Sequence, residues 1–200
     1  MSIFHQICNR KHNCDAEVLE HAIQLAVEIA REGREGRKIG TLFVVSDEKE
    51  VLKRSRNLIL DPLYGHAEKR KKIWDPDMRE TIKELAQLDG AFVVAGNGVV
   101  ISASRHIDAS AKCIELPLGL GTRHVAAASI TRDTRAVAVL VSTSAVVRIF
   151  FRGNLIAEIV PEAWALGDQS FKIKGPRKER QVADLRIISR TSEEGETDGR

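Results

Sequence analysis

The chain has 200 residues, of which 43% are hydrophobic and 30% are charged, and its formal charge is +3. A chain of this length buries about 70% of the surface that its unfolded form exposes, so it can build a core without metals or disulfides. It contains no run of about 18 apolar residues and no signal-peptide core, which predicts a cytoplasmic protein without a membrane span. The three cysteines, Cys8, Cys14 and Cys113, cannot pair evenly and indicate a reducing compartment.

Charge and aromatic content bear on the class of partner. The excess of 31 Lys and Arg over 28 Asp and Glu is small, whereas a protein that wraps nucleic acid carries a dense basic stripe. Six Phe, two Trp and one Tyr are too few for a platform on which single-stranded bases stack. The composition therefore favours a small polyanionic ligand over nucleic acid.

The first predicted element is an amphipathic helix over residues 15–34, where apolar residues recur at helical spacing. Asn13 or Asp15 can cap its start, and Gly33 or Gly36 can end it. The next elements are a buried strand over 39–46, turns near residues 61–65, a basic run over 69–72 and a second amphipathic helix over 77–88.

The rest of the chain predicts mostly strands. Two strands over 91–95 and 99–103 flank the turn Gly96-Asn97-Gly98, and three more lie over 136–142, 146–151 and 155–160. Between these two groups, residues 104–112 are predicted to form a polar connection. A glycine-rich loop over 116–124 then leads into a helix over 125–131. Because hairpins alternate with helical crossovers, we expect an α/β (α+β) fold with a central mixed β-sheet flanked by helices in a single domain.

The first motif that can carry chemistry is Asp89-Gly90-Ala91, where a predicted helix meets an apolar strand. A carboxylate at the mouth of a strand can ligate a divalent metal or accept a proton from a hydroxyl nucleophile. The glycine lets a ligand approach the backbone closely. Asp89 and Gly90 also fit a plain turn that ends the helix, and the local pattern alone favours that interpretation.

The second motif is GLGTRH over residues 119–124, a loop that runs into a helix. Its glycines admit a phosphate, N–H groups at the helix start point toward it, Thr122 can donate a hydrogen bond, and Arg123 offers a planar charged fork. The motif matches neither the P-loop nor the dinucleotide fingerprint. Taken alone, it leaves a phosphate site and a structural loop equally open.

Two further groups are weaker candidates. His5, Cys8, His12 and Cys14 have the residue types that bind zinc, but their spacing matches none of the usual zinc knuckles and favours ordinary side chains. The basic run over 69–72 is typical of a solvated face, although it is also compatible with a polyphosphate.

Together the two motifs are far more specific than either is alone. Asp89-Gly90-Ala91, followed about thirty residues later by LGTRH over 120–124, resembles the diadenylate cyclase domain. The similarity extends over roughly residues 38–161, from KIGTLFVVSD through the GNGVVISA hairpin to LPLGLGTRHVAAASIT. Lower similarity elsewhere and the HNCD start indicate a divergent branch of the archaeal type.

The resemblance implies a function. The diadenylate cyclase family condenses two ATP molecules into cyclic di-AMP and two pyrophosphates with a divalent metal, Mg²⁺ or Mn²⁺. Each 3′-hydroxyl must reach the α-phosphate of the other ATP, so two sites face each other and the acting form is a homodimer or a higher homo-oligomer. The implied segments are an N-terminal helical segment over 1–36, the catalytic domain over 37–162, a C-terminal extension over 163–190 and a disordered tail over 191–200.

The resemblance also implies residue roles. Asp89 would bind the metal and activate the hydroxyl. Gly90 and Ala91 would line the ATP pocket, and Leu116 and Gly119 of the LPLG segment would contact the adenine. The phosphates would be held by the second motif, through Gly121, Thr122, Arg123 and His124. Ser142 would also contact a phosphate.

Two positions depart from the family pattern. The second motif commonly reads Arg-His-Arg, whereas Val125 stands third here and removes a positive charge, which Arg132 or Arg135 could offset. Many members also have charged residues after the serine, where this chain has Thr143 and Ser144. The alternative to an active cyclase is therefore a sensor domain that binds ATP or cyclic di-AMP with weak or no turnover.

Overall fold

The computed structural model describes residues 15–108, 114, 116–117, 119–161, 173, 175–182 and 185–190. Its strands are β1 (Thr41–Val45), β2 (Ser55–Asn57), β3 (Ala91–Val94), β4 (Val100–Ile107), β5 (Val137–Val141), β6 (Val147–Phe151), β7 (Asn154–Pro161), β8 (Arg177–Val182) and β9 (Leu185–Arg190). Its helices are α2 (Ala16–Glu32), α3 (Glu48–Lys53), α4 (Pro76–Leu85) and α5 (Thr122–Asp133), with a 3₁₀ turn over Glu68–Arg70.

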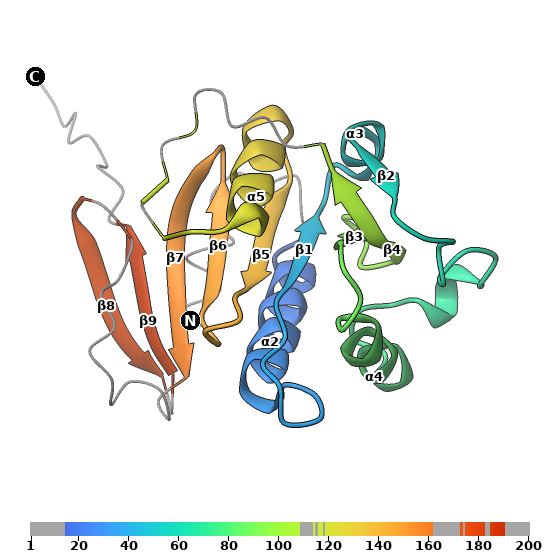
Figure 1. Ribbon diagram of the computed structural model, residues 1–200, viewed down its shortest axis with the longest axis horizontal. Helices are drawn as coiled ribbons and strands as arrows, with labels where there is room; N and C mark the ends of the chain where they lie inside the picture. Colours follow the sequence, from blue (N-terminus) through green and yellow to red (C-terminus); the bar gives the residue numbers. More distant parts are fainter. Residues whose placement is uncertain are drawn as a thin grey trace, which may run out of the picture.

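These strands form a nine-stranded sheet in the order β2-β4-β3-β1-β5-β6-β7-β9-β8 (Figure 1). The pair β1–β3 is parallel and the other pairs of the described strands are antiparallel. Helices cover both faces, with α2 and α4 on one and α3 and α5 on the other. The expected mixed sheet flanked by helices is confirmed.

Strand β1 shows why the sheet is covered on both sides. All five of its residues are buried, and successive side chains point to opposite faces. Phe43 belongs to the apolar layer under α2 and α4, where it stacks on Phe92 with ring centroids 5.2 Å apart. Leu42 and Val44 belong to the layer under α3 and α5. A polar strand could not occupy this central position.

Helix α2 begins and ends at residues that its sequence marks. The Asp15 side chain accepts a hydrogen bond from the Glu17 N–H at the start, and the Gly33 N–H donates to the Ile29 carbonyl at the end. The apolar face between them is buried, and burial of a side chain such as Leu19 or Ile23 stabilises the fold by about 1.5–3 kcal/mol.

The topology brings several loops to one edge of the sheet. Because β1 and β3 are parallel, Gly40 before β1 and Gly90 before β3 lie at the same edge. Strand β5 is antiparallel to β1, with Val141 opposite Thr41, so Ser142 after β5 reaches that edge as well. The start of α5 lies there too, since Thr122 and Arg123 share a cavity with Gly40 and Ser142.

The structure corrects some expected boundaries. Residues 104–107 belong to β4 and are not a polar connection, because they pair with the short strand β2 and Arg105 donates hydrogen bonds to Ser55 and Asn57. Helix α5 starts at Thr122 rather than Val125, and α4 ends at Leu85 rather than Leu88.

The flanking segments join the same body. Ile187 of β9 packs in the layer that α2 covers, and β9 pairs with β7 to continue the sheet. The segment boundaries at residues 36 and 162 stay predictions. The histidine and cysteine cluster over residues 5–14 and the tail over 191–200 lie outside the described residues. Within the described part of the chain, none of the helices is both long and apolar enough to cross a bilayer.

Candidate functional site

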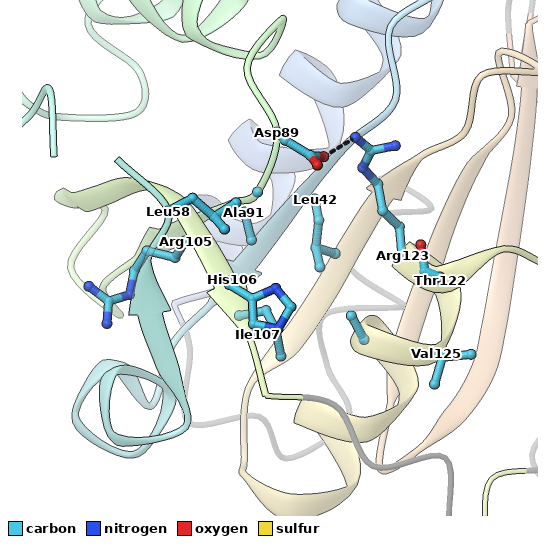
Figure 2. Close-up of a pocket in the computed structure, with 12 residues that line it drawn as sticks. Leu42, Leu58, Asp89, Ala91, Arg105, His106, Ile107, Thr122, Arg123 and Val125 are labelled. Atoms are coloured by element: carbon cyan, nitrogen blue, oxygen red, sulfur yellow. Dashed lines mark hydrogen bonds and ion pairs between the residues drawn. The ribbon is translucent and has the colours of Figure 1, made fainter. Parts of the chain in front are cut away.

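The two sequence motifs meet at this edge of the sheet. Asp89 precedes β3, and Arg123 stands in the first turn of α5. Arg123 Nη2 donates to Asp89 Oδ1 at 2.6 Å (Figure 2). The Asp89 side chain is 81% exposed and that of Arg123 39%, and an ion pair so exposed contributes about 0–1 kcal/mol. The pair can therefore separate when a ligand competes for either partner.

Gly40 makes room for Arg123. A Cβ atom at Gly40 would lie 3.3 Å from Arg123 Nη1 and 3.2 Å from Thr143 Cγ2, so a larger residue would press on both side chains. Arg123 Nε is buried and has no hydrogen-bond partner among the described residues, so one donor of the guanidinium is not satisfied by them.

A mostly apolar cavity of about 470 Å³ opens on the Asp89 side of the pair, within the range of about 300–1,000 Å³ typical of small-ligand sites. Its walls come from four strands or strand ends and from α5: Leu42, Leu58, Gly90, Ala91, Arg105, His106, Ile107, Val125 and Ala126 (Figure 2). Arg105 directs its guanidinium away toward β2, where it bonds Ser55 and Asn57. We call this space the apolar cavity.

A second space, of about 410 Å³, lies on the other side of Arg123 and is called the polar cavity. It is lined by Gly40, Gly119, Leu120, Gly121, Thr122, Arg123, His124, Leu140, Val141, Ser142, Thr143, Ser144 and Arg148. Thr122 and Arg123 line both cavities. The start of α5 faces this space, and unbonded backbone N–H groups in a first helical turn favour an anion.

His124 lines the polar cavity but is itself buried. Its Nε2 is 3.2 Å from Arg148 Nη1, and a guanidinium can only donate, so Nε2 accepts and the ring proton resides on Nδ1. Burial, and next the positive charge of Arg148, lower the pKa of His124 to about 4, while the Gly121 carbonyl opposes this shift. His124 is therefore neutral at physiological pH and adds no positive charge to the cavity.

Ser142 lies at the rim of the polar cavity in a tight turn. Its hydroxyl is within hydrogen-bond distance of the Val146 carbonyl (3.0 Å) and of Ser144 Oγ (2.8 Å), and it accepts from the Val146 N–H at 3.1 Å. The hydroxyl already serves the turn, which fixes the side of the cavity opposite α5.

Buried behind these groups is an ion pair that the sequence analysis did not identify. Arg148 of β6 and Glu158 of β7 stand opposite each other, and Arg148 Nε donates to Glu158 Oε1 at 2.7 Å. Glu158 Oε2 also accepts from the Ile173 N–H at 3.3 Å. Arg148 lines the polar cavity, whereas the Glu158 side chain is only 1% exposed.

The site residues expected from the sequence thus fall into three groups. Asp89, Gly90 and Ala91 line the apolar cavity; Gly119, Gly121, His124 and Ser142 line the polar cavity; and Thr122 and Arg123 line both. Leu116 lines neither cavity and instead packs, partly buried, on the apolar layer under α5. The side chains that wall the apolar cavity, Leu42, Leu58 and Ile107, carried no motif by which sequence reasoning could find them.

The donor set is informative about a metal. Among the described residues, no three His, Cys, Asp or Glu side chains gather at one point, and Asp89 is the only acidic residue of the two cavities. Mg²⁺ is commonly held by one or two carboxylates together with substrate phosphates. The residues present therefore fit a divalent cation that shares Asp89 with a bound phosphate.

Comparisons with known proteins identify the family of the chain. The family model described as "DAC: DisA bacterial checkpoint controller nucleotide-binding" matches residues 28–155. A diadenylate cyclase of Methanocaldococcus jannaschii is 45% identical over 146 residues, covering 72% of this chain and 46% of that protein. A diadenylate cyclase of Haloferax volcanii is 39% identical over 152 residues, covering 75% of this chain and 55% of that protein. The chain spans about half the length of these archaeal relatives.

A solved structure supports the fold. The crystal structure of a hypothetical membrane spanning protein from Bacillus cereus aligns with a TM-score of 0.52 at 21% identity, covering 76% of this chain and 67% of that one. The family match includes β1, the Asp89 motif, the start of α5 and Arg148, so it spans both cavities. Because that match covers more than half of the sequence, the chain belongs to the DAC family.

Proposed function

We propose that the protein is a diadenylate cyclase that condenses two ATP molecules into cyclic di-AMP and two pyrophosphates, in an active site formed by two copies face to face. The observation that carries this proposal is the Asp89–Arg123 ion pair between an apolar and a polar cavity. One nucleotide has an apolar end and a highly charged end, and the two adjoining cavities match that division. The names of the archaeal relatives support the same reaction.

The adenosine occupies the apolar cavity in this proposal. Leu42, Ile107 and Val125 offer aliphatic surface to the base, and His106 is the one ring that lines the cavity among the described residues. Gly90 lets the ligand approach the backbone between Asp89 and Ala91. This assignment differs from the sequence-based expectation that Leu116 and Gly119 contact the adenine. Leu116 lines neither cavity, and Gly119 lines the polar cavity.

The triphosphate occupies the polar cavity. Thr122 donates a hydrogen bond, the first turn of α5 offers its N–H groups, and Arg123 supplies a charged fork. Asp89 leaves Arg123 as phosphate oxygens replace its carboxylate. Asp89 would hold Mg²⁺ or Mn²⁺ beside the phosphates, and such a cation would neutralise part of their charge.

The reaction itself needs little covalent chemistry from the protein. The 3′-oxygen of one ATP bonds to the α-phosphorus of the other, the bond from that phosphorus to the β-phosphate oxygen breaks, and pyrophosphate leaves. Asp89 accepts the hydroxyl proton, and the exchange repeats in the opposite sense to close the ring. Positioning and charge neutralisation supply most of the acceleration in such transfers.

This geometry requires a second copy. Leu58 lines the apolar cavity, and the chain beyond it exposes Ile59, Leu60 (95% exposed) and Tyr64. Such a run of exposed apolar side chains is typical of an interaction surface. We assign the exposed apolar side chains of Leu58, Ile59, Leu60 and Tyr64 to the face on which two copies meet, because they border the cavity that must open toward the partner nucleotide.

The test is to incubate the protein with ATP and Mg²⁺ or Mn²⁺ and to separate the products by chromatography. Cyclic di-AMP should form, and Asp89→Asn should lower its rate by about 10²–10⁴-fold, as expected for loss of a general base. Asp77→Asn, which changes an exposed carboxylate in the first turn of α4, should leave the rate unchanged. ATP that is bound but recovered intact after long incubation would favour the sensor alternative.

A further inference from the structure

The Arg148–Glu158 pair is buried at the base of the polar cavity, in strands that are otherwise apolar there. Arg148 is flanked by Val147 and Ile149, and Glu158 by Ala157 and Ile159, all of which are fully buried. A pair of apolar side chains of similar size would often be as stable as a buried ion pair or more stable. Packing alone therefore gives no reason for charges at these two positions.

The contacts of Arg148 leave part of its guanidinium unused. Nε donates to Glu158 and one Nη1 hydrogen points to His124, but Nη2 makes no hydrogen bond with any described residue. Because Arg148 lines the polar cavity, Nη2 is placed to meet a ligand there. A guanidinium carries five N–H donors in a rigid fork that matches phosphate oxygens.

The other basic residues near the polar cavity also favour a role for Arg148 in binding an anion. His124 is neutral, and Arg123 is engaged by Asp89 in the free protein. Val125, where the family motif has a second arginine, lines the apolar cavity and carries no charge. Arg132, considered as a substitute, bonds its neighbour Asp133 and lines neither cavity, and Arg135 lines neither. Arg148 is the remaining cation among the described residues that line the polar cavity.

We propose that Arg148 binds the triphosphate at the base of the polar cavity, and that Glu158 is the positioning residue that holds its guanidinium toward that cavity. This inference rests on the proposed function and adds a phosphate-binding residue outside both sequence motifs. Arg148 supplies a positive charge in the polar cavity, whereas Val125, at the position of the family's second arginine, supplies none. Glu158 lies behind the guanidinium, so the pair forms a dipole whose positive end faces the ligand.

The test compares two ligands that differ only in their phosphates. Calorimetry measures binding of adenosine and of α,β-methylene-ATP, whose non-cleavable α–β linkage prevents turnover, in the presence of Mg²⁺. In Arg148→Gln/Glu158→Gln both charges are removed and no buried charge is left alone. Its dissociation constant for the ATP analogue should rise by about 10–100-fold, the usual effect of a lost charge-assisted hydrogen bond, with adenosine binding unchanged within about twofold.

Single variants separate binding from positioning. Arg148→Lys keeps the charge but loses the fork, and should weaken the analogue by a smaller factor of about 3–10 without affecting adenosine. It also serves if the double variant does not fold. Glu158→Gln keeps an oxygen that accepts from Arg148 Nε and should lower the melting temperature while leaving binding of the analogue as tight as in the parent, a combination that simple loss of structure does not produce.

The control is a matched pair of charges away from both cavities. Arg186 of β9 and Glu179 of β8 form an exposed ion pair, so Arg186→Gln/Glu179→Gln removes the same two charges and should change neither affinity. Equal losses for adenosine and the analogue, or no loss, in the Arg148 variants would overturn the assignment. If the parent binds neither ligand, the proposed function fails with it; if the parent forms cyclic di-AMP but the variants bind normally, only Arg148 is misassigned.

Discussion

The backbone at Gly90 is the most sharply testable feature of the site. Gly90 has φ of +107°, a conformation that L side chains rarely adopt. A Cβ atom there would lie 2.6 Å from the Ser104 carbonyl carbon and 2.7 Å from the Arg105 nitrogen. Both atoms are backbone of β4 and cannot rotate away. Gly90→Ala therefore has to push β4 from β3 or change the conformation of the turn that carries Asp89.

Two costs add up in this variant. The left-handed backbone conformation costs an L residue about 1–2 kcal/mol, and overpacking against a fixed neighbour costs about 1–3 kcal/mol more. The sum is about 2–5 kcal/mol of unfolding free energy. For a domain of about 150–250 residues, each kcal/mol lowers the melting temperature by about 2–4 °C, so a fall of about 4–20 °C is expected.

Thermal unfolding of Gly90→Ala and Gly36→Ala separates the two costs. Gly36 also has a positive φ, +74°, but a Cβ there would meet nothing within 4 Å. Gly36→Ala thus carries the backbone cost alone, about 2–8 °C, and should bind the ATP analogue normally. Gly90→Ala should melt lower and should also bind the analogue more weakly, since β3 and β4 both wall the apolar cavity. Equal melting temperatures in the two variants would refute the steric argument.

Two further predictions concern the subunit face and the buried histidine. Leu60→Glu should leave the melting temperature nearly unchanged, because Leu60 is 95% exposed. It should abolish self-association, measured by sedimentation, and cyclic di-AMP formation, while the ATP analogue still binds. Undiminished product formation would contradict the assigned face. The pKa of His124 is lowered from 6.5 to about 4 in the folded protein. Between these pH values the unfolded state binds a proton that the folded state does not. The free energy of unfolding should therefore be highest above about pH 6.5 and should fall as the pH drops toward 4. Urea unfolding of His124→Gln over this range should show a smaller loss, and an unchanged pH dependence would argue against a neutral buried ring.

The elements that the sequence predicted well are those with a local physical signal. The β3–β4 hairpin was predicted from Gly96-Asn97-Gly98, and in the structure Asn97 Oδ1 accepts from the Val99 N–H while Gly98 has φ of +80°. A Cβ at Gly98 would meet the Trp74 ring at 2.2 Å, so this glycine also serves a contact from outside the hairpin. The turn signal sufficed for the hairpin, but the contact with Trp74 was not readable from the sequence.

Two of the elements that were missed, β2 and β8, are polar edge strands. All six residues of β8 are exposed, and β2 has only three residues, two of them exposed. Neither strand carries an alternating apolar pattern. A strand at the edge of a sheet can be held in its extended conformation by backbone hydrogen bonds to the strand beside it. Strand β8 is paired along its whole length with β9, and β2 with the end of β4. The β2–β4 pairing joins Ser55 to Ile107 and Asn57 to Arg105, which lie far apart in the sequence, and so leaves no local mark.

The site shows the same division between local and tertiary information. Asp89 and Arg123 are 34 positions apart and were both singled out from their motifs, yet their 2.6 Å contact required the fold. Arg148 and Glu158 did leave a signal that was not used. Each is a lone charge in an apolar strand, and the two strands flank a predicted turn at Gly153. The pairs next to that turn, Phe151 with Asn154 and Phe150 with Leu155, would set Arg148 opposite Ala157, and the register shift between Ile149 and Phe150 sets it opposite Glu158 instead. The lone charges could be noticed in the sequence, but their pairing required the fold.

The two arginines of the polar cavity differ in how firmly a carboxylate holds them, and this difference decides what each can do. The Arg123–Asp89 pair is exposed and worth about 0–1 kcal/mol, so phosphate and a divalent cation can separate it. The Arg148–Glu158 pair is buried, and removing one partner would leave an uncompensated charge at a cost of about 3–5 kcal/mol. Ligand binding is therefore expected to separate Arg123 from Asp89 and to leave Arg148 paired with Glu158. Salt should weaken the Arg123 contribution through screening but leave that of Arg148 largely intact, because buried charges are screened much less than exposed ones.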